Sequence, residues 1–351
     1  MPRGFGALQR FFQEPEYAFG GHVPGMSDLS PEERYGQSLV VFLDVPFDLT
    51  STGGRTSARG PEAVRYASAK MVELYDCLSG RDLPATVPWA DLGTYRAAVP
   101  KEVEEQVARA IASPAAEAEG LPQDILTVID AHLASLKPLP DIAGILYRDG
   151  KIPFAFLGEH YPTALLVQGL LQAREDERHP FAIVHLDAHR DMKADYLGMR
   201  RCHTTPFYEI LEAGFPGERL IQVGIRQAAA DEDEYARAHG VHTLSVQDIR
   251  RRPDASWDKL YVFTEGTDLY VSLDIDSLSS EFTPSTGTPV PFGLSPDDVV
   301  GIFGAIHPTA RLVGADVAEV GFRGEGEVRD GDVREAVAAW ILAQKLLQKV
   351  V

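Results

Sequence analysis

The stretch Val184-His185-Leu186-Asp187-Ala188-His189-Arg190-Asp191 and a second one, Val271-Ser272-Leu273-Asp274-Ile275-Asp276, each join an apolar run to acidic residues spaced by two. Residues i and i+2 of a β-strand point to the same side, and Asp187, His189 and Asp191 share that alternation. Carboxylates crowded on one side repel one another and lose hydration, which costs several kcal/mol unless cations occupy the site. The two stretches therefore indicate two halves of a site for a pair of divalent metal ions.

A third element, Leu157-Gly158-Glu159-His160-Tyr161-Pro162-Thr163, follows the apolar run 152–156 and places an imidazole at the end of another predicted strand. For a single Asp-x-Asp pair, the alternative interpretation is a strand end whose carboxylates cap the next helix. For an isolated histidine, a structural role is the more common interpretation. Two acidic stretches and a third strand end in one chain favour a metal site over both alternatives.

In chain order, the three elements resemble the Gly-Gly-(Asp/Glu)-His-Ser, Asp-Ala-His-x-Asp and Ser-x-Asp-x-Asp motifs of the ureohydrolases, the arginase and agmatinase family. Residues 276–291 resemble a family segment ending in Thr-Gly-Thr-Pro-x-Pro, and residues 222–226 resemble its Gln-Ile-Gly-Ile-Arg strand. The segments 45–48 and 57–65 resemble the opening of the agmatinase-like branch. The resemblance spans roughly residues 38 to 349. It implies an arginase-like fold and a metal-dependent hydrolase of non-peptide C–N bonds in linear amidines.

The composition of the 351-residue chain is that of an ordinary globular protein, with 44% hydrophobic residues. No run approaches the ~18 apolar residues of a membrane-spanning helix. A formal net charge of −19 disfavours nucleic acid and anionic membranes as partners and is compatible with a cationic substrate. Cys77 and Cys202 form no Cys-x-x-Cys motif, and residues 1–10 lack a signal-peptide pattern. We therefore expect a cytoplasmic protein.

Apolar segments of strand length alternate with amphipathic segments of helical length, which predicts an α/β fold with a parallel sheet covered on both faces. We expect a single three-layer α/β/α domain with a largely parallel eight-stranded sheet. The predicted strands are 39–44, 89–92, 152–157, 182–187, 220–225, 241–244, 269–274 and 312–319. The predicted helices are 61–78, 124–136, 162–175, 231–238 and 330–349. Ligands of such a sheet bind outside the carboxyl ends of its strands.

Two segments, residues 1–37 and residues 96–121, do not fit this alternation of strands and helices. We expect residues 38–351 to form the ureohydrolase catalytic domain and residues 1–37 to form an aromatic-rich N-terminal extension. The extension is too apolar for a plain disordered tail, so we expect it to pack on a neighbouring subunit or on the rim of the active site. Residues 96–121, rich in Ala and Glu, predict a helical insertion whose purpose the sequence leaves open.

The resemblance also implies six metal ligands. One ion would be held by His160, Asp187, Asp191 and Asp274, and the other by His189, Asp187, Asp274 and Asp276, with Asp187 and Asp274 bridging. The family implies two Mn²⁺ per subunit, and the oxygen-rich donor set favours Mn²⁺ too, with Ni²⁺, Co²⁺ and Zn²⁺ as alternatives. Two ions that share a water molecule lower its pKa toward neutrality. The resulting hydroxide would attack the guanidinium carbon and release urea and an amine.

Asp191, His203 and Glu319 are the predicted catalytic residues, and the last two are also predicted to bind substrate. His203, in a loop after the second motif, would supply or relay a proton to the leaving amine. The alternative is a surface histidine, or one bonded to Thr204. Glu319 matches the guanidinium-binding glutamate of the family, a planar anion for a planar cation. Its alternative is an ordinary salt bridge at a strand end.

The substrate depends on residues next to the second motif. Arginase-like members carry an asparagine where this chain has Lys193, so L-arginine is disfavoured. Agmatine, hydrolysed to putrescine in polyamine metabolism, fits the opening motif. Alternatively, Arg190 and Lys193 bind the carboxylate of a guanidino acid such as 4-guanidinobutyrate, or they point to solvent or pair with Asp195. A smaller guanidine compound would fit if Tyr161 and the N-terminal extension close the pocket.

The chain departs from the family motifs at six positions that are not metal ligands, namely Leu157, Tyr161, Ser279, Ser280, Ser285 and Phe292. We therefore expect catalysis in a pocket of altered shape. One alternative is hydrolysis of a formimino group, as in the formiminoglutamases. Another is a catalytically silent scaffold of the same fold, which the intact ligand set disfavours. The resemblance also implies a homo-oligomer, a trimer or a hexamer.

Overall fold

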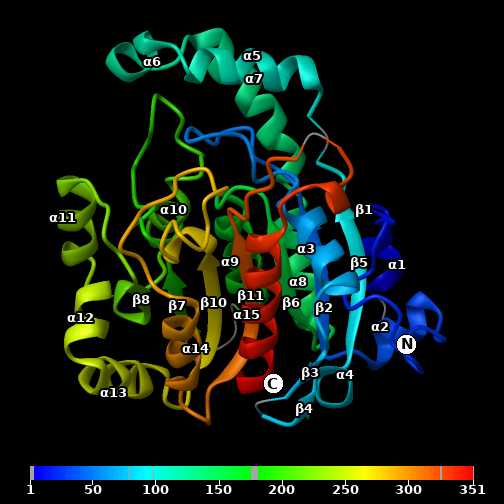
Figure 1. Cartoon of the computed structure of the whole chain (residues 1–351). Helices are drawn as coiled ribbons and strands as arrows, with labels where there is room; N and C mark the ends of the chain where they lie inside the picture. Colours follow the sequence, from blue (N-terminus) through cyan, green and yellow to red (C-terminus); the bar gives the residue numbers. More distant parts are fainter. Residues whose placement is uncertain (1–3, 78, 98, 175–180, 325, 351) are drawn as a thin grey trace.

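The computed structural model describes residues 4–77, 79–97, 99–174, 181–324 and 326–350, and its centre is a nine-stranded sheet (Figure 1). The strand order is β1 (Phe12–Gln13), β5 (Trp89–Tyr95), β2 (Val40–Val45), β6 (Ile152–Leu157), β11 (Arg311–Ala318), β10 (Asp268–Asp274), β7 (Ala182–Leu186), β8 (Leu220–Val223) and β9 (His242–Leu244). Every pairing is parallel except that of β1 with β5. The predicted α/β class is confirmed, and the predicted eight strands are all present.

The sheet is buried on both faces because its central strands are apolar along their whole length. In β6, Phe154 and Phe156 belong to one core, while Ala155 and Leu157 belong to the core on the opposite face. Helices α3 (Gly60–Lys70), α14 (Pro296–Gly304) and α15 (Arg334–Val350) cover the first face. Helices α8 (Leu139–Arg148), α9 (Pro162–Ala173) and α10 (Pro206–Glu212) cover the second. This double cover explains why the strands read as continuous hydrophobic runs.

The described part of the chain contains nine other α-helices. They are α1 (Phe5–Gln9), α2 (Pro31–Gln37), α4 (Leu83–Thr86), α5 (Lys101–Ile111), α6 (Pro114–Glu119), α7 (Gln123–Leu133), α11 (Ala230–Ala238), α12 (Val246–Arg251) and α13 (Pro253–Thr264). The helix predicted over 61–78 ends at Lys70, since the chain then enters a small hairpin of β3 (Tyr75–Asp76) and β4 (Arg81–Asp82). The predicted helix ends at 78 and 175 lie outside the described residues.

In the described part of the chain, no helix is long and apolar enough to cross a membrane.

The ninth strand, β1, comes from the N-terminal segment and was not predicted from the sequence. It is two residues long and pairs with the outer edge of β5. Phe5, Phe12 and Phe19 are buried, and the ring of Phe19 lies 4.8 Å from that of Phe156 and stacks on it. These aromatic side chains therefore pack on the sheet edge and core of their own chain.

The insertion forms α5 and α6, which stand away from the sheet beyond the carboxyl ends of its strands (Figure 1). Two contacts tie it to loops at that end. Glu104 forms an ion pair with Arg55 at 3.6 Å, and the N–H of Leu121 donates to the carbonyl oxygen of Leu197 at 2.9 Å. The insertion thus braces two of the loops that surround the candidate site.

Candidate metal centre

Three neighbouring strand ends bring the predicted ligands together. Asp187 directly follows β7, Asp274 ends β10, and His160 follows β6 by three residues. Asp276 lies in η3 (Ile275–Ser277), the single helical turn after β10. Because β7 and β10 are adjacent and β6 is separated from β10 only by β11, these side chains meet at one edge of the sheet. This is where open parallel sheets place their ligands.

A first group of side chains surrounds the Nδ1 atom of His160. Carboxylate oxygens of Asp187, Asp191 and Asp274 lie 3.4, 3.0 and 3.3 Å from it. All four residues are buried, and one ligand atom from each lies within 4.8 Å of those of the others. The four residues predicted for one ion therefore converge around a common point.

A second group surrounds the Nδ1 atom of His189. Asp276 Oδ2 lies 3.0 Å from it, and Asp187 Oδ1 lies 3.5 Å from it. Asp187 thus contributes one oxygen to each group, in keeping with the predicted bridging role. Asp274, the other predicted bridge, lies with the His160 group and is not part of the tight cluster formed by Asp187, His189 and Asp276.

The electrostatics of the site favour bound positive charge. Burial, together with the nearby charges of Asp276 and Asp187, raises the pKa of Asp274 well above its ordinary value. Burial and the charge of Asp187 likewise raise the pKa of Asp191 to about 7. Although burial opposes it, the two carboxylates beside His189 raise the pKa of that imidazole to about 12. Four carboxylates and two imidazoles form a donor set that suits hard divalent ions such as Mn²⁺.

Hydrogen bonds behind His160 fix the direction of its ring. The Nε2 atom lies 2.8 Å from the Ser272 hydroxyl, which itself donates to Asp316 Oδ1 at 2.7 Å. Asp316 is buried and also accepts from the hydroxyls of Tyr270 and Thr163. Partners of this kind hold a histidine so that its other nitrogen faces a metal. These partners were not predicted from the sequence, although Ser272 lies two residues before Asp274 and therefore faces the same side of β10.

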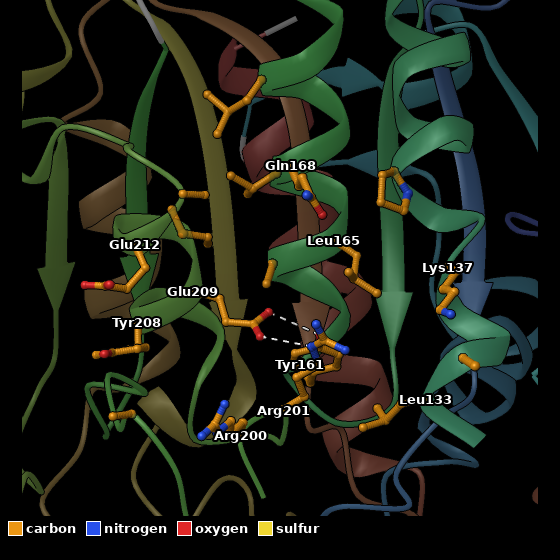
Figure 2. A pocket seen from close by; sticks show the side chains of 18 of the residues that line it. Leu133, Lys137, Tyr161, Leu165, Gln168, Arg200, Arg201, Tyr208, Glu209 and Glu212 are labelled. Carbon is orange, nitrogen blue, oxygen red and sulfur yellow. Dashed lines mark hydrogen bonds and ion pairs between the residues drawn. The ribbon is translucent and has the colours of Figure 1, made fainter. Parts of the chain in front are cut away.

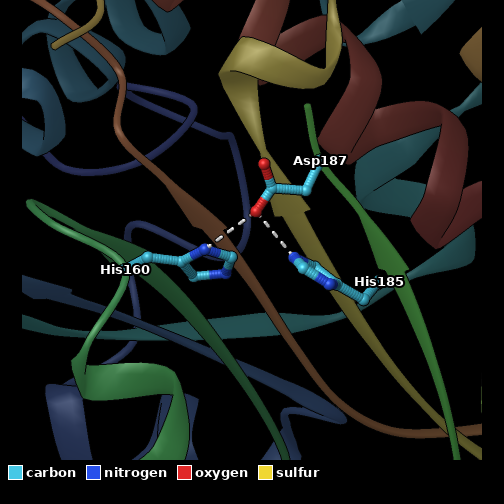
Figure 3. Close-up of side chains that lie close together, drawn as sticks. All are labelled: His160, His185 and Asp187. Atoms are coloured by element: carbon cyan, nitrogen blue, oxygen red, sulfur yellow. Dashed lines mark hydrogen bonds and ion pairs between the residues drawn. The ribbon is translucent and has the colours of Figure 1, made fainter. Parts of the chain in front are cut away.

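His185 is a further residue of the site that was not predicted from the sequence. Its imidazole lies close to His160 and Asp187, and one ligand atom from each of the three residues lies within 4.8 Å of the other two (Figure 3). It precedes Asp187 by two residues, so the strand alternation used for Asp187 and His189 would have found it.

His203 lies beside the candidate metal ligands, on a cavity of about 310 Å³ that His189, Asp191 and Lys193 also line. Its Nδ1 atom lies 2.8 Å from the carbonyl oxygen of Thr50, and its Nε2 atom lies 3.1 Å from the Thr52 hydroxyl. Burial lowers the pKa of His203 to about 4, so the imidazole is neutral at pH 7. The predicted alternative of a surface histidine does not fit this buried position.

Glu319 directly follows β11 and points to the same edge of the sheet. Its Oε1 atom accepts the backbone N–H of His160 at 3.0 Å, which ties it to the metal-site loop. Burial and the charge of Glu159 raise the pKa of Glu319 well above its ordinary value. Both Glu319 (φ 61°) and Asp191 (φ 52°) have left-handed backbone conformations, which are uncommon for residues other than glycine and cluster at functional sites.

The structure separates the two cations predicted to bind substrate. Lys193 lines the 310 Å³ cavity, and its Nζ atom forms an ion pair with Glu232 at 3.3 Å. Arg190 is buried away from the lining of that cavity, where its guanidinium binds Asp233, Gln222 and Thr243. These contacts hold the guanidinium of Arg190 outside the cavity. The position of Arg190 therefore does not support its predicted role in binding substrate.

Tyr161 and Phe292, the bulky departures from the family motifs, also lie away from the 310 Å³ cavity. The Tyr161 hydroxyl donates to Glu209 at 3.2 Å on the wall of a separate cavity of about 840 Å³ (Figure 2). Phe292 is 78% exposed. Tyr161 therefore does not close the cavity beside the metal-site residues.

Comparison with known proteins agrees with this geometry. Residues 38–321 match the model of the arginase family. The chain belongs to the arginase family. The N(1)-aminopropylagmatine ureohydrolase of Thermus thermophilus is 32% identical over 291 residues, which cover 83% of this chain and 85% of that protein. The agmatinase of Halalkalibacterium halodurans is 28% identical over 304 residues, covering 86% and 89% of the two chains.

A crystal structure described as a hypothetical agmatinase from Burkholderia thailandensis superimposes with a TM-score of 0.67 at 26% identity, covering 90% of this chain and 86% of that chain. The resemblance to the agmatinase-like branch is thus confirmed. As a member of the arginase family, the protein is a hydrolase that acts on C–N bonds of amidines or guanidino compounds.

Proposed function

We propose that this arginase-family protein binds two divalent metal ions and hydrolyses a small guanidino compound to urea and an amine. The observation that carries the proposal is the position of Asp187, whose two carboxylate oxygens face two different imidazoles, those of His160 and His189. The proposed ligands are His160, Asp187, Asp191 and Asp274 for one ion, and His189, Asp187, Asp276 and Asp274 for the other. The donor chemistry supports Mn²⁺.

Bound at this site, a pair of divalent ions would supply a reactive water molecule at neutral pH. The protein must then hold the guanidinium group and move a proton. We assign the first task to Glu319, whose carboxylate can form two parallel hydrogen bonds with a planar guanidinium. The bond from the His160 N–H to Oε1 supports this role, because it fixes the direction of the carboxylate.

We assign the proton transfer to His203. Its Nδ1 atom faces the carbonyl oxygen of Thr50, which can only accept, so the ring proton lies on Nδ1 and Nε2 is a proton acceptor. Because the imidazole is neutral at pH 7, its Nε2 atom can accept the proton that the attacking water releases and donate it to the amine nitrogen as the C–N bond breaks. The urea product and the amine then leave through the cavity that His203 lines.

Agmatine, converted to putrescine, is the substrate that the agmatinase relatives support. A second candidate, a guanidino acid such as 4-guanidinobutyrate, is favoured by the ammonium group of Lys193 on the cavity wall. The test is release of urea by the Mn²⁺-loaded protein from agmatine, 4-guanidinobutyrate, arginine and guanidine, repeated with Ni²⁺. Formamide in place of urea from a formimino substrate would support formiminoglutamase activity. Tight metal binding without any turnover would support a silent scaffold.

We further propose that residues 38–351 form the catalytic domain, with residues 1–37 as an N-terminal extension. Assembly as a trimer or hexamer is a proposal drawn from the family resemblance, and a place in the cytoplasm is a proposal drawn from the spacing of Cys77 and Cys202. Light scattering of the purified protein tests the assembly, and a mass corresponding to a single chain would contradict it.

A further inference from the structure

His185 is a buried imidazole that the proposed ligand set does not use. It lies in β7 with its ring stacked on Phe207, at 3.8 Å between ring centroids. Its Nε2 atom lies 2.9 Å from Asp187 Oδ2, the same oxygen that lies 3.4 Å from His160 Nδ1. Figure 3 shows the Asp187 carboxylate between the two rings. The direction of the His185 hydrogen bond therefore affects the residue shared by both groups of proposed ligands.

The amide of Gln222 determines that direction. Its Nε2 atom lies 2.7 Å from the carbonyl oxygen of Arg190 and 3.0 Å from His185 Nδ1, while its Oε1 atom lies 2.8 Å from Nη1 of Arg190. A carbonyl oxygen only accepts and a guanidinium only donates, so the two groups of Arg190 allow a single orientation of the amide. The amide N–H therefore points at His185 Nδ1.

The tautomer of His185 follows from this orientation. Since Nδ1 accepts the amide N–H, the ring proton lies on Nε2 and is donated to Asp187 Oδ2. The other oxygen, Asp187 Oδ1, accepts the backbone N–H of His189 at 2.6 Å. Each oxygen of the Asp187 carboxylate is thus held by its own fixed donor.

We infer that His185 is a positioning residue for the bridging carboxylate of Asp187, with Gln222 and Arg190 setting the direction of its hydrogen bond. The inference rests on the proposed two-metal function. The same proton prevents Nε2 from serving as a metal ligand, so the group formed by His160, His185 and Asp187 is not a separate metal site. The inference also gives Arg190 a role, because its guanidinium and its carbonyl oxygen together orient the amide of Gln222.

The test is the Mn²⁺ affinity of the full chain, measured by competition with a chelator, together with the absorption spectrum of the Co²⁺-loaded protein. His185→Phe keeps the stacking on Phe207 and removes the donor, so affinity should fall about ten- to hundredfold, as for other outer partners of metal ligands. His185→Gln carries an N–H at the place of Nε2 and should stay within a few-fold of wild type. His242→Phe, in the edge strand β9, which β8 separates from β7, is the matched control and should leave affinity unchanged.

Gln222→Glu tests the direction of the hydrogen bond. A glutamate only accepts, so it places a proton on Nδ1, either by taking it from Nε2 or by charging the ring, and both changes should lower Mn²⁺ affinity and alter the Co²⁺ spectrum. Because the effect passes through the imidazole, it should vanish when His185→Phe is already present. An equal effect in both backgrounds would overturn the inference and would indicate a general electrostatic effect of the new charge.

The remaining outcomes are also decisive. Equal loss of affinity in His185→Phe and His185→Gln, with unchanged unfolding midpoints, would show that the donor does not matter and would overturn the inference. Unchanged affinity in His185→Phe would do the same. A wild-type protein that binds no metal would overturn the proposed function itself and the inference with it. If wild type binds two ions and the variants bind Mn²⁺ as tightly as wild type does, only the inference about His185 would be overturned.

Discussion

The Nζ atom of Lys193 lies 3.3 Å from the carboxylate of Glu232, on the wall of the cavity that also contains His203. Both oxygens of Glu232 already accept backbone N–H groups, from Met192 and Ala229. The Lys193 side chain is 24% exposed, so its ammonium group can still meet a ligand in the cavity. Substitution of Lys193 therefore distinguishes between the two candidate substrates.

Lys193→Met removes the ammonium group and keeps the length of the side chain. If a guanidino acid is the substrate, the KM of the variant for 4-guanidinobutyrate should be about tenfold or more above that of wild type, because a charge-assisted hydrogen bond is lost. The KM for agmatine should fall or stay the same. Steady-state urea release by the variant and by wild type measures both values. A higher KM for agmatine alone would contradict a role for Lys193 with a carboxylate.

Glu319→Gln should abolish guanidinium binding without loss of metal. The neutral amide cannot provide two acceptors to a planar cation, so kcat/KM should fall by at least about a hundredfold, mainly through a lost charged pair. Metal content should equal that of wild type, since Glu319 is not among the proposed ligands. Glu327→Gln, an exposed neighbour in sequence, is the matched control and should keep full activity. Loss of metal in Glu319→Gln would contradict the assignment.

His203 should make stability depend on pH. Burial lowers its pKa to about 4 in the folded protein, against about 6.5 when unfolded. A lowered histidine pKa stabilises the fold above pH 6.5, and this contribution is lost as pH falls from 6.5 to 4. Over that range, the free energy of unfolding of metal-free wild type should drop by about 3 kcal/mol more than that of His203→Asn.

Denaturant unfolding at several pH values measures this difference. His239→Asn removes an exposed histidine and should give a curve parallel to that of wild type. Parallel curves for wild type and His203→Asn would contradict a buried, neutral His203.

Tyr161→Phe should affect stability and leave turnover unchanged. The variant loses the bond from the Tyr161 hydroxyl to Glu209, and both residues line the 840 Å³ cavity and not the 310 Å³ cavity. The free energy of unfolding should fall by about 1 kcal/mol, the usual worth of such a bond. Denaturant unfolding and urea release measure the two properties. A tenfold change in KM would indicate that the phenol shapes the substrate site after all.

The convergence of the candidate metal ligands could be predicted from the sequence because their motifs lie at, or just beyond, the ends of strands. Asp187 and Asp274 stand at the carboxyl ends of β7 and β10, His189 and Asp276 follow in the loops beyond them, and the sheet order brings these ends together. The parallel sheet itself followed from continuous apolar runs such as that of β6. A two-residue strand such as β1 carries no comparable pattern, so its pairing with β5 could not be foreseen.

Residues that act through partners on other elements could not be predicted. Asp316 and Gln222 orient His160 and His185 from neighbouring strands, and no spacing along the chain connects them. Arg190 and Lys193 lie beyond the regular part of β7, where strand alternation no longer predicts direction. One side chain therefore points to the cavity and the other to Gln222, although both carry a positive charge next to the same motif.

The most direct test of the two-metal account is the Mn²⁺ content of wild type and Asp187→Asn, measured by elemental analysis after dialysis. Asp187 offers one oxygen to each group of proposed ligands, so a neutral amide there should disrupt both. We expect two ions per wild-type chain and loss of both in the variant, while Asp195→Asn, at a nearby exposed carboxylate, keeps two. Two ions retained by Asp187→Asn would contradict the account.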